Sequence, residues 1–270
     1  DSMQVYKGMD VGTAKVKEKE TAGVIHHLVD CYEFDEEYNV KIFQEKARQA
    51  IQEIHKKGGM PIICGGTGLY IKSMLYDYQF QDQQQDNDFF QYLQGRSNDE
   101  LWGLLKIVDP KSCENLHRNN RQRVIRALCM AHEGKKKSSI LEEQEHKPIY
   151  DAYIIGLTMD RDHLYERINE RVDLMMEEGL LEEVSSLVKK KENVWNLQSF
   201  QGIGYKEWKE YFLHGESKES CVERIKKNSR NFAKRQYTWF KNQMDVHWYD
   251  VEEENFQKKL LEDINEWRNR

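Results

Sequence analysis

The chain has 270 residues, of which 39% are hydrophobic and 33% charged, and its formal net charge is -6 at pH 7. It is long enough to bury a full core and has no apolar run that could span a bilayer, so we expect a soluble cytoplasmic protein. The negative charge argues against an indiscriminate nucleic-acid binder, and the five cysteines, none in a CxxC spacing, argue against a structural zinc site.

The first predicted elements are a loop and a short strand. Residues 1–15 are rich in glycine and polar side chains, which predicts a loop. Residues 26–30, His-His-Leu-Val-Asp, predict a strand, and adjacent histidines on a strand point to opposite faces, which argues against a shared metal. Because the chain opens at Asp1 with no leading strand, we expect it to be the remainder of a longer protein.

A helix and a strand follow. Asn39 is a good N-cap, and apolar side chains then repeat on one helical face as far as Gly58 and Gly59, which end the helix. Residues 60–64, Met-Pro-Ile-Ile-Cys, predict a strand that is buried on both faces, as in a parallel sheet. A helix that leads into such a strand is typical of an α/β fold.

The strand runs into the glycine-rich loop 65–68, Gly-Gly-Thr-Gly, ahead of another predicted helix. Ligands of parallel sheets bind beyond the carboxyl ends of the strands, where this loop lies. Gly65 and Gly66 let the backbone approach an anion closely, and Thr67 is the one side chain of the loop that can hydrogen-bond. An ordinary tight turn is the open alternative.

A helical insertion is predicted next, because residues 77–95 are polar and rich in glutamine and residues 99–107 return to helical spacing. Pro110 marks its end. The predicted domains are an α/β core over 1–76 and 119–248, the insertion over 77–118, and a helical C-terminal tail over 249–270.

Four arginines fall between residues 118 and 126. Arg123 and Arg126 are three apart on one helical face, and a guanidinium pair is well suited to bind phosphate. A solvated helix face is the alternative. Further on, residues 134–147 predict a charged surface loop and 150–158 a second strand of the sheet.

The last third of the chain predicts a helical stretch over 161–189, a glycine-containing loop over 201–206 and a long helix capped by Ser217. Residues 218–241 contain eight basic and two acidic residues. Such a basic stripe on an acidic protein indicates a polyanionic partner such as RNA or a diphosphate.

Six of these segments resemble, in the same order, the motifs of the bacterial tRNA dimethylallyltransferases: residues 1–15, 65–70, 119–128, 171–175, 201–206 and 233–240. The resemblance implies an enzyme that transfers a dimethylallyl group from dimethylallyl diphosphate to the exocyclic amine of the adenosine just 3′ of the anticodon. It also implies a P-loop nucleotide-kinase-like parallel sheet core, an all-helical insertion that clamps the anticodon stem-loop, and a monomer.

The same resemblance assigns roles to individual residues. Asp1 matches the general base, Thr67 would lie near the target base, and Arg171 with Arg167 would neutralise the diphosphate beside Gly65 and Gly66. An ion-paired role for both arginines within the helix is the alternative. The residues that match tRNA-contacting segments are Asp1, Ser2, Met3, Gln4, Thr67, Gln122, Arg123, Val124, Ile125, Arg126, Gln201, Gly202, Ile203, Gly204, Tyr205, Lys206, Lys234 and Arg235.

The family's cofactor is Mg²⁺, and its P-loop, whose hydroxyl would bind the metal and whose lysine would bind diphosphate, is expected upstream of Asp1. No metal ligand is therefore expected in this chain. Two other functions stay open: an adenylate isopentenyltransferase acting on free AMP, ADP or ATP, and an RNA-binding module without catalysis. The insertion and the basic helix favour RNA over a mononucleotide.

Overall fold

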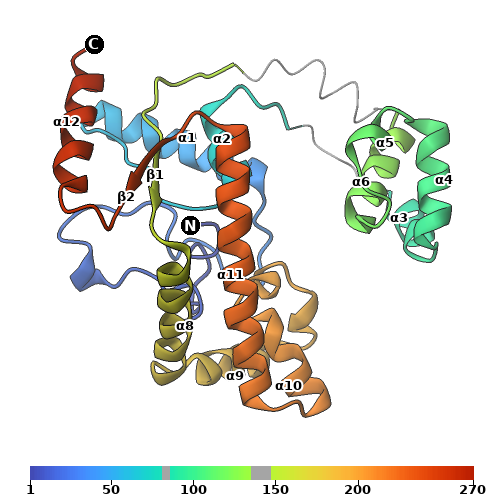
Figure 1. The fold of residues 1–270 in the computed structure, drawn as a ribbon. Coiled ribbons are helices and arrows are strands. Elements are labelled where there is room, and N and C mark those ends of the chain that lie inside the picture. Colours follow the sequence, from blue (N-terminus) through green and yellow to red (C-terminus); the bar gives the residue numbers. More distant parts are fainter. Residues whose placement is uncertain (81–85, 135–146) are drawn as a thin grey trace. The chain divides into compact units, whose positions relative to one another are not determined.

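The structure is a computed structural model that describes residues 1–80, 86–134 and 147–270. They divide into two compact units, Asp1–Leu75 with Tyr150–Arg270, and Tyr76–Ile149 (Figure 1). The first unit contains α1 Val40–Lys56, α2 Gly68–Leu75, β1 Ile155–Thr158, α8 Arg161–Glu177, α9 Leu180–Lys190, α10 Lys209–His214, α11 Lys218–Gln243, β2 His247–Asp250 and α12 Phe256–Arg268. It also contains four short 3₁₀ helices, Glu18–Glu20, Val194–Asn196, Ser199–Gln201 and Lys206–Trp208. Within the described ranges, no helix combines the length and apolarity that a membrane crossing requires.

The regular strands found in the described residues form one small parallel sheet. β1 pairs with β2 from Ile155 opposite His247 to Thr158 opposite Asp250. The predicted second strand is thus confirmed in its C-terminal half. Of residues 249–270, predicted as a helical tail, Phe256–Arg268 form α12, and residues 249 and 250 belong to β2.

Two predicted strands are wrong. Residues 26–30 turn, because Leu28 and Asp30 have φ angles of 61° and 52°, in the left-handed region that strands do not use. Residues 60–64 have no ladder partner among the described residues, and Ile62 is 87% exposed. A strand requires a hydrogen-bonded neighbour, which an apolar pattern alone does not provide.

The two predicted N-caps are confirmed. Asn39 caps α1 by accepting from the backbone N–H groups of Lys41 and Ile42, and Ser217 caps α11 by accepting from Ser220. The stretch predicted as helical over 161–189 is two helices, because Gly179 adopts a φ of 96° that ends one helical path and begins another.

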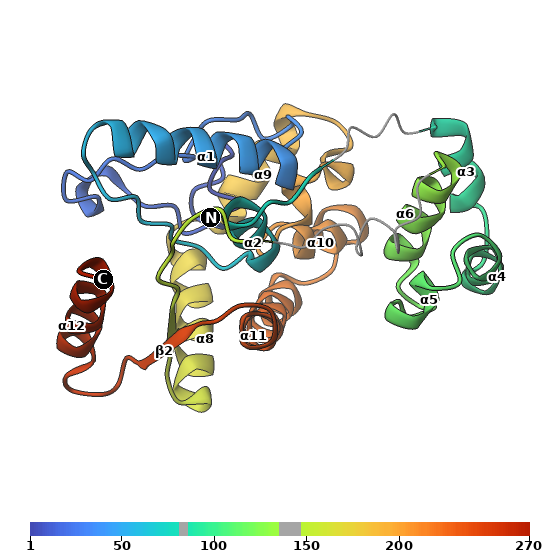
Figure 2. The ribbon, with the colours of Figure 1, turned by 90° about the horizontal axis from the view of Figure 1, so that it is seen from above.

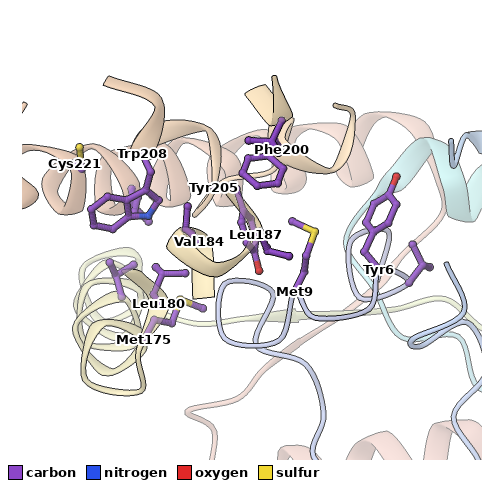
Figure 3. Packing of buried hydrophobic residues seen from close by; sticks show 14 of the residues in the cluster. Tyr6, Met9, Met175, Leu180, Val184, Leu187, Phe200, Tyr205, Trp208 and Cys221 are labelled. Carbon is purple, nitrogen blue, oxygen red and sulfur yellow. The ribbon is translucent and has the colours of Figure 1, made fainter. Parts of the chain in front are cut away.

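The core of the first unit gathers side chains from α8, α9, α11 and the intervening 3₁₀ helices around the fully buried Trp208 and Phe200 (Figure 3). The loop over residues 1–15 also contributes, because Val5, Tyr6 and Met9 are buried in this cluster. The polar loop is therefore fixed at three points to the core. Seen from above, the N-terminus of the chain lies beside α2 (Figure 2).

The second unit is all-helical, and it extends beyond the predicted end of the insertion at residue 118. Its helices are α3 Asn87–Gln94, α4 Asn98–Val108, α5 Ser112–Asn115 and α6 Arg121–His132. α6 belongs to this unit because Val124, Ile125 and Leu128 pack against Leu101 and Leu105 of α4 in one buried cluster. The predicted assignment of α6 to the α/β core is therefore wrong.

We expect replacement of Arg121 by Ala to destabilise the second unit by about 1.5–3 kcal/mol, since hydrogen bonds made by a charged group contribute on this scale. Arg121 donates to the carbonyls of Arg96, Leu93 and Gln94 at 2.6–3.3 Å, which lie at and after the C-terminus of α3. Amide hydrogen exchange of α3 and α6 measures the effect. Arg123→Ala, at an exposed position of the same helix, is the control; equal effects of the two substitutions would contradict this role of Arg121.

Candidate active site

The start of the chain contacts the glycine-rich loop that precedes α2. The Ser2 and Thr67 hydroxyls lie 2.9 Å apart, and the Asp1 nitrogen donates to the carbonyl of Cys64 at 3.5 Å. One Asp1 carboxylate oxygen, Oδ1, accepts from the Met3 N–H at 2.7 Å. Its other oxygen has no hydrogen-bond donor among the described residues, so the exposed carboxylate is oriented by one oxygen while the other faces solvent.

Helix α11 covers the same loop from the other side, a contact that the sequence did not predict. Gln236 Nε2 donates to the carbonyl of Gly66 at 3.1 Å. A Cβ built on Gly68 would lie 2.1 Å from the Trp239 ring, and one on Gly66 would lie 1.9 Å from Gln236 Nε2. The glycines thus permit close packing against α11. Gln236 and Trp239 lie in the motif over residues 233–240, which was the available signal.

The loop over residues 201–206 lies beside the start of the chain. The Met3 methyl group packs against Gly202, where a Cβ would lie 2.6 Å away. Gly204 donates its N–H to Glu207 Oε2 at 2.9 Å, and Asn228 of α11 donates to Glu207 Oε1 at 2.7 Å. The buried Glu207 carboxylate, which sequence reasoning missed, therefore ties this loop to α11.

Within this loop the predicted role of Tyr205 requires correction. Its side chain is fully buried, so the ring is not available to touch tRNA. Gln201 and Lys206 are exposed, and Gly202 and Ile203 are half-buried. Gln201 donates to the carbonyl of Trp195 at 2.8 Å.

Arg167 and Arg171 are both exposed on α8. Neither makes an ion pair with a described residue, so the alternative in which acidic neighbours satisfy them is not observed. Arg167 approaches the Met159 sulfur at 4.0 Å. Neither arginine makes a hydrogen bond or an ion pair with the loop around Thr67 in the described part of the chain.

Several cations of the basic helix α11 are used within the protein. Arg224 pairs with Glu216, Lys226 pairs with Asp173 at 2.7 Å, and Arg230 donates to Asn169. Lys234 and Arg235 come directly before Gln236, the α11 residue that contacts the glycine-rich loop. Both are exposed and make no ion pair with any described residue. Lys218, Lys227 and Lys241 are exposed as well and make no ion pair with any described residue, so cations along the whole stripe remain available to meet an anion.

The remaining candidates lie on α6 in the second unit. Gln122, Arg123 and Arg126 are exposed. Val124 and Ile125 are buried in the core of that unit, so their side chains do not face solvent. With 3.6 residues per turn, they lie on the opposite face of α6 from Gln122, Arg123 and Arg126, which explains the pattern of burial.

A metal site was tested against the donor groups present. Over residues 1–80, 86–134 and 147–270, no three side chains of His, Cys, Asp or Glu are grouped as metal ligands. Mg²⁺ needs no such cluster when substrate phosphates supply most of its ligands, and the roles assigned to side chains below involve no metal.

Comparison with known proteins places the chain in a family. Residues 4–243 match the IPP transferase family. The chain is 47% identical to a tRNA dimethylallyltransferase of Anoxybacillus flavithermus over 98% of this chain and 85% of that protein. It is 40% identical, with a TM-score of 0.70, to the crystal structure of a tRNA delta(2)-isopentenylpyrophosphate transferase from Staphylococcus epidermidis, covering 98% of this chain and 89% of that one.

A second solved structure is more distant in sequence. It is a eukaryotic dimethylallyltransferase acting on tRNA, which is 27% identical, has a TM-score of 0.85, and is matched over 100% of this chain and 72% of that one. The family match covers most of the chain, and the relatives are similar over most of their own length. The chain therefore belongs to the IPP transferase family.

Proposed function

We propose that this protein transfers a dimethylallyl group from dimethylallyl diphosphate to the exocyclic N6 amine of the adenosine just 3′ of a tRNA anticodon. The observation that carries the proposal is the contact between Ser2 and Thr67, which brings Asp1 beside the glycine-rich loop. Relatives that are named for dimethylallyl transfer to tRNA support it.

In this proposal Asp1 is the general base. The adenine amine is a poor nucleophile because its lone pair is delocalised into the ring, so a carboxylate must orient the amine and accept its proton. The N6–C1 bond forms while the C1–O bond to diphosphate breaks with its electron pair, and the N6 proton passes to the unpartnered Asp1 oxygen. The Met3 N–H, 2.7 Å from the other oxygen, holds the carboxylate in place.

The diphosphate would be bound by backbone and by arginine. The N-terminus of α2 follows Gly65 and Gly66, and a helix N-terminus favours an anion. Arg171 and Arg167, exposed and without ion pairs among the described residues, would neutralise the leaving group. A flipped adenosine would reach Asp1 past Thr67, since a stacked base is not accessible to a carboxylate in a protein site.

The tRNA would bind as an anticodon stem-loop to surfaces on both units. Exposed Gln122, Arg123 and Arg126 support a clamping role for the helical unit, and exposed Lys234 and Arg235 support phosphate contacts by the core. We also propose a core of the P-loop nucleotide-kinase type, which the parallel pairing of β1 with β2 supports, and a monomeric protein.

The test is transfer of radiolabelled dimethylallyl from its diphosphate to an unmodified anticodon stem-loop in the presence of Mg²⁺, with AMP as a competing acceptor. Label in RNA alone is expected, and a stem-loop with guanosine at the target position should stay unlabelled. Label in AMP would instead indicate the adenylate isopentenyltransferase, and RNA binding without label in either acceptor would indicate a non-catalytic module. Omission of Mg²⁺ should abolish transfer if the diphosphate carries the metal into the site.

A further inference from the structure

One carboxylate outside the proposed site collects four hydrogen bonds. Glu183 of α9 accepts from the backbone N–H groups of Asp10 and Val11, each at 2.7 Å, and of Gly12 at 3.1 Å. It also accepts from the Tyr205 hydroxyl at 2.7 Å. Three successive N–H groups that converge on an anion form a rigid nest, so this side chain fixes the backbone of the loop.

The Tyr205 hydroxyl is suited to remain a donor in this cluster. Burial, followed by the negative charge of Glu183, raises the pKa of the Tyr205 phenol above its usual range. The ring also lies against the backbone at Gly12, where a Cβ would be 2.5 Å away. The loops over residues 10–14 and 201–206 are therefore joined through one carboxylate and one ring.

The fixed loop in turn holds the segment that carries Asp1. Gln4 donates its Nε2 to the carbonyls of Thr13 and Ala14 at 3.1 and 3.0 Å. On the other side, Met3 packs against Gly202 of the second loop. Asp1 and Ser2 thus extend from a segment that is held by two contacts, one made by Gln4 and one by Met3. Both contacts are to loops that the cluster around Glu183 joins.

We propose that Glu183 is a positioning residue for prenyl transfer. Its carboxylate orders the loop over residues 10–14, which through Gln4 fixes the direction in which Asp1 meets the acceptor amine. This inference rests on the proposed function, because it concerns the geometry of the same site. It assigns to α9 a role that sequence reasoning missed, since Glu183 lies in an acidic run, Glu182-Glu183, that looks like a solvated helix face.

The test replaces Glu183 with Gln, whose amide group must place an N–H donor against backbone N–H donors. The expected result is a fall in kcat of about 10- to 100-fold, the scale on which misplaced catalytic groups cost rate, with KM for the stem-loop changed by less than about threefold. Hydrogen exchange of the Asp10, Val11 and Gly12 amides should accelerate by about tenfold or more in the same variant. Glu182→Gln, at the exposed neighbouring position, should change neither kcat nor the exchange of these amides.

If Glu183→Gln does not fold, Tyr205→Phe tests the same cluster by removing only one donor; faster exchange at residues 10–12 with a lower kcat is again expected. Faster exchange with kcat unchanged within twofold would overturn the positioning role, and so would a loss of activity that only follows the loss of folded protein. Absence of transfer by the unsubstituted protein would refute the proposed function instead. The exchange comparison would still report whether Glu183 orders the loop.

Discussion

Replacement of Asp1 by Asn is expected to lower kcat by about 10²- to 10⁴-fold, the usual contribution of a general base. The amide has nearly the same shape and can still accept the Met3 N–H that the carboxylate accepts at 2.7 Å. It cannot take up the proton that N6 must lose. Single-turnover transfer to the stem-loop, with both substrates saturating, measures the effect on chemistry separately from binding.

Binding of the stem-loop should change by less than about threefold in the same variant, because one carboxylate among many contacts contributes little to RNA affinity. Asp245→Asn is the matched control, since Asp245 is exposed and has no partner among the described residues. An Asp1→Asn variant that retains more than about a tenth of kcat would show that Asp1 is not the base. A normal rate would then require another proton acceptor near Thr67.

Local signals in the sequence predicted the helical parts of the fold. The N-caps Asn39 and Ser217 mark the starts of α1 and α11, and an apolar repeat follows Asn39, because capping and periodicity act within one helix. The loop of residues 1–15 was also predicted. The sheet was predicted only in part. β1 lies within the strand predicted over 150–158, but the four-residue β2 was missed, and the strand predicted at 60–64 depends on neighbours that a local pattern does not specify.

In the candidate site, too, the sequence motifs were predicted, whereas the contacts from distant helices were not. The motif around Thr67 and the start of the chain were both identified, and the structure brings them into contact through Ser2. The side chains that hold this contact, Gln236 of α11 and Glu183 of α9, were missed. Each is a polar residue in a polar helix, and only the tertiary packing distinguishes it from its solvated neighbours.

Replacement of Gly68 by Ala is expected to destabilise the protein by about 1–3 kcal/mol, as for other overpacked positions, and to lower kcat/KM by about 10²-fold. The new methyl group would lie 2.1 Å from the Trp239 ring, so either α11 or the loop that carries Thr67 must move. Alanine normally favours a helix over glycine, so the sign of the effect tests the contact. Gly103→Ala in α4 is the control, because no described residue lies within 4 Å of a Cβ built there; that variant should gain about 0.5–1 kcal/mol.

The partner of Gly68 can be tested by a second substitution. If the ring of Trp239 is what the new methyl group meets, Gly68→Ala combined with Trp239→Leu should be more stable and more active than the sum of the two single effects, since residues in contact are not additive. A smaller side chain at position 239 makes room for the methyl group, so that Thr67 can again contact Ser2. Simple additivity would mean that the damage arises elsewhere in the loop, and the Trp239 ring would then have no part in positioning Thr67.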